Sequence, residues 1–192
     1  MMHHDSFDDR RRGLEAEYFH KQEQQLIEKL RQRHQLAKVT GIADEDLLRD
    51  LDELGYTRET VMLLYLVPLV EVAWAEGGVA EEERSLILEA ARLRGIDEAS
   101  AANKELTQWL KHRPPVEFFE KTLRLIRAVL QTLPPEEREH ETQDISAYCV
   151  RIAKASHSFG FLTTGHISAE ERQILERITT TLKMKRAENK PE

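Results

Sequence analysis

Apolar residues recur at helical spacing along almost the whole chain, and glycine or proline interrupts the pattern between one segment and the next. No alternating run rich in valine, isoleucine and threonine predicts a strand. The pattern therefore predicts an all-α protein. The helices expected from it cover residues 13–38, 45–54, 57–76, 80–94, 98–111, 116–132, 135–155 and 168–184. The apolar side expected for the helix over residues 80–94 consists of Leu86, Leu88, Ala90, Ala91 and Leu93.

The first of these segments, residues 13–38, predicts a long helix that carries only one narrow apolar stripe. Phe19, Leu26, Leu30 and Ala37 follow one another at spacings of seven, four and seven, and most other positions are charged or amides. A helix of this kind is not held by its own propensity alone. It must lie on its own domain, on a second copy or on a partner, and the sequence leaves docking on its own domain and ordering by a partner open.

The segment 57–76 predicts the core helix, because it is apolar on almost every side between Val61 and Trp74. A helix that is hydrophobic all round belongs in the centre of a bundle. Pro68 inside it costs about 3 kcal/mol unless the chain bends, so we expect a kink between Leu64 and Pro68. Trp74 and Trp109 stand at helical spacing among apolar residues and are expected in the core.

One stretch of the chain recurs. Residues 77–89 lie over residues 165–177 at an offset of 88, and residues 70–75 lie over residues 150–155 at an offset of 80. The identical positions are Gly77, Glu82, Glu83 and Arg84 against Gly165, Glu170, Glu171 and Arg172. Part of this similarity is ordinary helix-start chemistry, because a serine followed three residues later by glutamate forms a capping box. The matched helices before it still favour two pseudo-repeated helix pairs.

Composition limits the classes of function. Charged residues make up 33% of the chain and the net charge is −7, so no basic face for nucleic acid is expected. No apolar run approaches the roughly 20 residues that span a bilayer, and no secretion signal is evident at the start. The single cysteine, Cys149, is expected to be buried and fits a reducing compartment. We therefore expect a cytoplasmic protein.

The chain is expected to divide into three parts: residues 1–42 with a disordered start and the long amphipathic helix, a helical domain over residues 43–184, and a charged tail over residues 185–192. No phosphate-binding loop, nucleophile elbow or paired catalytic acid appears, so no enzyme is expected. His157 and His166 would need two further ligands to hold zinc, and the segment between them offers none.

The stretch from Leu66 to Gly95 resembles the helix-turn-helix core of TerB-like domains, the tellurite-resistance family. The family pattern is E-x-A-x-A-D-G followed by an acid in the first turn of the next helix. The matching positions are Glu71, Ala73, Ala75, Glu76, Gly77 and Glu83. The resemblance covers about residues 57–184 and implies an all-α bundle of two similar halves. It also implies a non-enzymatic binding or adaptor module in a bacterial stress- or envelope-associated assembly.

The resemblance further implies that Glu71, Glu76 and Glu83 point into one acidic pocket for a divalent cation. Glu76 departs from the family, which has aspartate there. Three carboxylates without histidine or thiol suit Ca²⁺ or Mg²⁺. The alternative, which we favour, is that Glu76 ends one helix, Glu83 lies at the dipole end of the next helix, and Glu71 is solvated. A divalent-cation-binding sensor is accordingly the alternative function.

Two apolar features are candidates for binding a protein partner or a second copy. One is the stripe of the long helix, with Phe19, Leu26 and Leu30. The other is Phe159 and Phe161 beside glycine in the segment before the last helix, where flexible aromatic residues are typical of binding sites. Both phenylalanines could equally close the end of the bundle.

Overall fold

The computed structural model describes residues 5–155 and 167–183, and all their side chains except those of residues 5–16 and Phe19. Every regular element in these ranges is a helix, which confirms the all-α prediction. The elements are α1 Asp5–Thr40, α2 Glu45–Glu53, the 3-10 helix η1 Val61–Leu66, α3 Val67–Ala73, α4 Glu81–Leu93, α5 Ala101–Lys111, α6 Val116–Thr132, α7 Pro135–Ala155 and α8 Ala169–Lys183.

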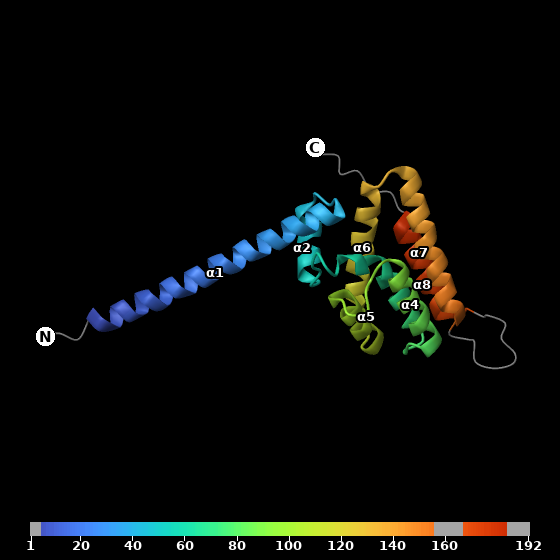
Figure 1. The fold of residues 1–192 in the computed structure, drawn as a ribbon, viewed down its shortest axis with the longest axis horizontal. Coiled ribbons are helices and arrows are strands. Elements are labelled where there is room, and N and C mark those ends of the chain that lie inside the picture. The colour runs from blue at the N-terminus through green and yellow to red at the C-terminus, as the bar shows by residue number, and fades with distance from the viewer. Residues whose placement is uncertain (1–4, 156–166, 184–192) are drawn as a thin grey trace.

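Helix α1 projects from a bundle formed by the other helices (Figure 1). Only its last turns are anchored. Leu36 is fully buried, Gln32 donates to the Tyr56 carbonyl at 3.2 Å, and Arg33 is paired to Asp52 in α2 at 3.3 Å. Gly41 ends the helix at φ +69°, which a glycine adopts at no steric cost.

The start of α1 differs from the prediction. The helix begins at Asp5 and not at Gly13, so the polar lead-in expected over residues 1–12 is helical from Asp5 onward. Asp8 and Asp9 follow the helix start, where negative charge complements the helix dipole, and arginine is a good helix former. Gly13 lowers the stability of the helix by about 1 kcal/mol, which is not enough to end it.

The centre of the bundle is α3, all of whose residues are buried. It contacts α4, α6, α7 and α8. The single helix expected over residues 57–76 is wrong: the chain winds as a 3-10 helix to Leu66 and then as α3, with Pro68 in its first turn. The reason lies in Pro68, which has no N–H for the Leu64 carbonyl and is tolerated only at a helix start.

The remaining helices surround α3 as the apolar stripes predict. Helix α6 begins directly after one proline pair, α7 begins at the second proline of the next pair, Pro135, and both helices match their expected bounds. The buried residues of α6 are Phe118, Phe119, Thr122, Leu123, Leu125, Ile126, Val129 and Leu130. Two details differ: Ser100 caps α5, which starts at Ala101 and not at Glu98, and Leu93, expected on the apolar side of α4, is 68% exposed.

No helix in the described ranges is both long enough and apolar enough to cross a membrane.

Candidate functional site

Glu71 lies on α3 in the centre of the bundle and forms an ion pair with Arg177 of α8. Its side chain is only 5% exposed, and that of Arg177 is 39% exposed. The second carboxylate oxygen, Oε2, is buried without a hydrogen-bond partner among the residues described. Burial raises the pKa of Glu71, and the hydrogen bond and charge of Arg177 offset part of that rise. The expectation that Glu71 is solvated is therefore wrong, because this residue of α3 packs inside the bundle, where it links α3 to α8 at an energetic cost.

Glu83 occupies the third position of α4 and faces back to the start of the helix. Its Oε2 accepts a hydrogen bond from the Ala80 backbone N–H at 2.8 Å, and the residue is 2% exposed. Burial, partly offset by that hydrogen bond, raises the pKa of Glu83 to about 7, and the nearby charges of Glu171 and Glu76 add to the rise. This carboxylate is thus already engaged as a helix cap.

Glu171 plays the same part at the start of α8. Its Oε2 accepts from the Ser168 backbone N–H at 2.7 Å, and its own N–H donates to Ser168 Oγ at 3.2 Å. This is the capping box that the sequence predicts, and Glu171 is fully buried within it. The electrostatic effect of Glu171 on Glu83 shows that the two caps lie near each other.

Glu76 follows α3 and is exposed. Among the residues described, no group of three or more histidine, cysteine, aspartate or glutamate side chains is arranged to hold a metal ion. The structure therefore does not gather Glu71, Glu76 and Glu83 into one cluster: Glu71 faces Arg177, and Glu83 faces its own helix start. Cation binding by these three residues stays an untested prediction.

A second ion pair joins two other helices, α4 and α7. Arg151 of α7 lies 3.5 Å from Glu89 of α4, and both side chains are about half exposed (53% and 52%). At the offsets found in the sequence, Arg151 aligns with Glu71 (offset 80) and Arg177 aligns with Glu89 (offset 88). The sequence analysis missed these pairs, although the opposite charges at matched repeat positions were a signal for them.

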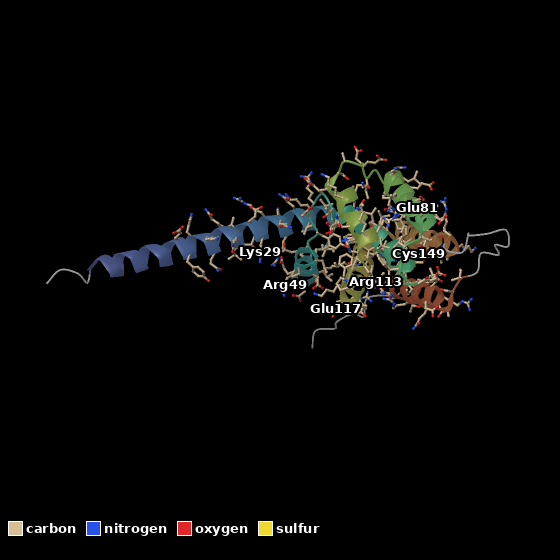
Figure 2. The ribbon with its side chains drawn as sticks, turned by 90° about the horizontal axis from the view of Figure 1, so that it is seen from below. Lys29, Arg49, Glu81, Arg113, Glu117 and Cys149 are labelled. Atoms are coloured by element: carbon tan, nitrogen blue, oxygen red, sulfur yellow. The ribbon has the colours of Figure 1, made fainter. Side chains whose placement is uncertain are left out.

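Cys149 and the two tryptophans are structural. Cys149 is fully buried on α7, as predicted, and burial raises the pKa of its thiol, so the reactive thiolate is disfavoured. Figure 2 shows Cys149 inside the bundle. Trp109 is buried, and Trp74 donates through Nε1 to the Trp109 carbonyl at 2.8 Å. Trp74 is partly buried and packs against the core, so the core position expected for both tryptophans is fully reached only by Trp109.

The largest unpartnered surface in the described part of the chain is the projecting half of α1. All its described side chains from Glu17 to Arg31 are exposed, including Leu26 at 59% and Leu30 at 54%. Figure 2 shows these side chains, with Lys29 labelled, standing clear of the bundle. Ala37, the last residue of the predicted stripe, does pack against the core.

The other partner candidates cannot be placed in the same way. The side chain of Phe19 and the whole of Phe159 and Phe161 lie outside the described residues, as do His157, His166 and the predicted tail over residues 185–192.

Comparison of the chain with models of known protein families, with curated proteins and with solved structures gave no match. The similarity to TerB-like domains therefore rests on the sequence motif alone.

Proposed function

We propose that the chain is a non-enzymatic binding module of adaptor type, in which α1 is the partner-binding arm and the bundle is its base. The exposure of every described side chain from Glu17 to Arg31 carries the proposal. In proteins, most of the stability of a helix comes from packing of its apolar face and not from its own propensity. Its own bundle covers only the last turns, through Leu36 and Arg33.

The charge along α1 indicates the chemistry of the partner. Residues 13–24 hold three glutamates and one lysine, a net charge of −2 (1 − 3), and residues 25–38 hold one glutamate and four basic residues, a net charge of +3 (4 − 1). The partner we propose is a protein helix with a narrow apolar stripe and the reverse charge order, paired along α1. Opposite charges flanking such a stripe set the orientation of paired helices.

We also propose that the bundle is of TerB-like type, with α3–α4 and α7–α8 as its two similar halves, in a bacterial stress- or envelope-associated assembly. The matched caps at Glu83 and Glu171 support the two halves, as do the two ion pairs. The assembly is suggested only by the motif around Glu71 and Gly77. Cation sensing is the alternative function, and the test below includes a chelator for that reason.

The test is affinity capture from native cell extract with two variants of the full chain. Leu26→Glu with Leu30→Glu places charge on the stripe, and Gln24→Glu with Gln25→Glu adds the same charge away from it. Because all four residues are exposed, neither variant should lose the fold. We expect a helical protein partner that the native chain and the glutamine variant retain, that the leucine variant loses, and that a chelator does not affect.

Two results would overturn the proposal. A partner held equally by both variants would place binding elsewhere, and a partner lost with chelator would favour the cation sensor. Light scattering of the purified chain tests self-association. If the native chain is a dimer and the leucine variant is a monomer, the helix that pairs with α1 belongs to a second copy of the chain.

A further inference from the structure

A cavity of about 310 Å³ is lined by residues from the end of α6, the beginning of α7 and the end of α8. These three helix ends lie together at one end of the bundle (Figure 1). The apolar part of the cavity is formed by Leu130 of α6 and Leu182 of α8, both buried. Thr142 of α7 also lines it, but the Thr142 hydroxyl is already engaged, because it donates to the Arg138 carbonyl at 2.7 Å. The two leucines give the cavity an apolar floor, as ligand pockets have, beneath a lining that is otherwise polar or charged.

The rim of the cavity is basic in a chain whose net charge is −7. Among the described residues, Arg127, Arg138 and Lys183 line it together with one acid, Glu139, which gives this lining a net charge of +2 (3 − 1). Glu139 accepts a hydrogen bond from Gln143 at 3.2 Å and forms no ion pair with the described cations. The positive charge of the cavity is therefore not neutralised from within its lining.

Arg127 and Arg138 differ from the other partly buried arginines of the described residues in having no ion pair. Partly buried arginines elsewhere in the described ranges are ion-paired to carboxylates: Arg33 to Asp52, Arg84 to Glu81, Arg94 to Glu141 and Arg177 to Glu71. The two remaining partly buried arginines, Arg127 and Arg138, have no ion pair or side-chain hydrogen bond to any described residue, and they line the same cavity.

We propose that this cavity binds a small organic anion, with its carboxylate or phosphate held by Arg127 and Arg138 and its apolar body against Leu130 and Leu182. Guanidinium groups match the planar, two-pronged geometry of carboxylate and phosphate oxygens. Arg127 also lines a neighbouring cavity with Asp44 and Asp46, but neither arginine forms an ion pair with a described carboxylate. Two partly desolvated cations that are not ion-paired are costly, and a bound anion lowers that cost. Lys183 lies in the last turn of α8, where a cation is common, so the argument rests on the two arginines.

Arg124 provides a matched control on the same helix. It lines a neighbouring cavity with Asp44 and Asp46 but does not line this one, and it is exposed. Arg124→Gln therefore makes the same change of charge, one turn away, without touching the proposed site.

The experiment is isothermal titration calorimetry of the full chain with four probes. Benzoate and phenyl phosphate offer the two anionic heads on an apolar ring, benzyl alcohol offers the ring without charge, and inorganic phosphate offers charge without the ring. We expect at least one of the two ring anions to bind, and whichever binds more tightly identifies the head group. Benzyl alcohol and inorganic phosphate should both bind more weakly.

Arg127→Gln with Arg138→Gln should weaken binding of the ring anion by about ten- to a hundredfold, the usual effect of losing hydrogen bonds to a charged group. Each single substitution should give part of that loss, and Arg124→Gln should give none. Because the arginines repel each other in the empty cavity, the double variant should unfold at the same temperature as the native chain or higher. The proposal is overturned if neither ring anion binds, if benzyl alcohol binds as tightly, or if Arg124→Gln weakens binding equally.

Discussion

Two ion pairs connect the helix pair α3–α4 with the helix pair α7–α8, and we expect them to contribute differently to the stability of the fold. Each pair sends one charged residue across to the other: Glu71 to Arg177, and Arg151 to Glu89. In the ion pair Glu71–Arg177 the carboxylate is buried, whereas the ion pair Arg151–Glu89 lies at the surface with both side chains about half exposed. Burial, and not the presence of the pair, determines how much each contributes.

The largest effect should come from removing the cation of the buried pair. Arg177→Ala leaves Glu71 buried and unpaired, and we expect the free energy of unfolding to fall by about 3 kcal/mol. This value is the lower end of the range for a broken buried ion pair, because Arg177 is partly exposed to water. The loss should shrink at low pH, where Glu71 is protonated. Urea denaturation measures both quantities. Arg151→Ala, which removes the cation of the exposed ion pair, should cost at most about 1 kcal/mol; equal losses would contradict the comparison.

An intermediate effect is expected from the buried cap of α4. The pKa of Glu83 is raised from 4.5 to about 7, so between these values the folded protein binds more protons than the unfolded chain. The contribution of Glu83 to stability is therefore fully present below about pH 4.5 and is lost as the pH rises to about 7. Glu83→Gln keeps an acceptor for the Ala80 N–H and should make the free energy of unfolding depend less steeply on pH across this window.

The matched control for Glu83 is Glu81→Gln in the same turn, where the side chain is exposed. Its slope should equal that of the native chain. If Glu83→Gln shows the native slope as well, the buried cap does not titrate as we describe.

The smallest effect concerns the N-cap residue that directly precedes each helix. Ser168 precedes α8, and its hydroxyl accepts a hydrogen bond from the Glu171 N–H. Ala80 precedes α4 and has no side-chain acceptor. Ser168→Ala should lower the free energy of unfolding by about 1 kcal/mol, and Ala80→Ser should raise it by up to about that amount. Thermal denaturation of both variants tests whether the two starts can be interchanged; a loss in Ala80→Ser would show that they cannot.

The sequence predicts best where the chain carries explicit stops. Proline pairs place α6 and α7 at their observed bounds, and Gly41, Gly55 and Gly95 end their segments at positive φ. The pattern fails around Pro68, because a segment that is apolar on every side has no period to distinguish an α-helix from a 3-10 helix. The prediction for Leu93 is wrong for another reason: Leu93 is the last residue of α4 and follows the buried residues of that helix, and residue type alone does not show where the buried face ends.

The candidate sites were less predictable than the fold. The importance of Glu71 was visible in the motif, but its partner Arg177 lies 106 residues away and emerges only when the two helix pairs are packed. The cavity of Arg127 and Arg138 was not visible at all, because each arginine reads as a solvated residue on its own helix. A site assembled from the ends of three helices leaves no local pattern.

The length of the projecting helix α1 determines which charges of the molecule act on a protein that approaches its tip. From Asp5 to Arg31 the helix axis runs about 40 Å at 1.5 Å per residue. In physiological salt, electrostatic fields decay over about 8 Å. The tip of the arm is thus several screening lengths from the bundle and is electrically independent of it. A protein arriving at the tip meets only the local charge of the helix, so the acidic bundle neither attracts nor repels it.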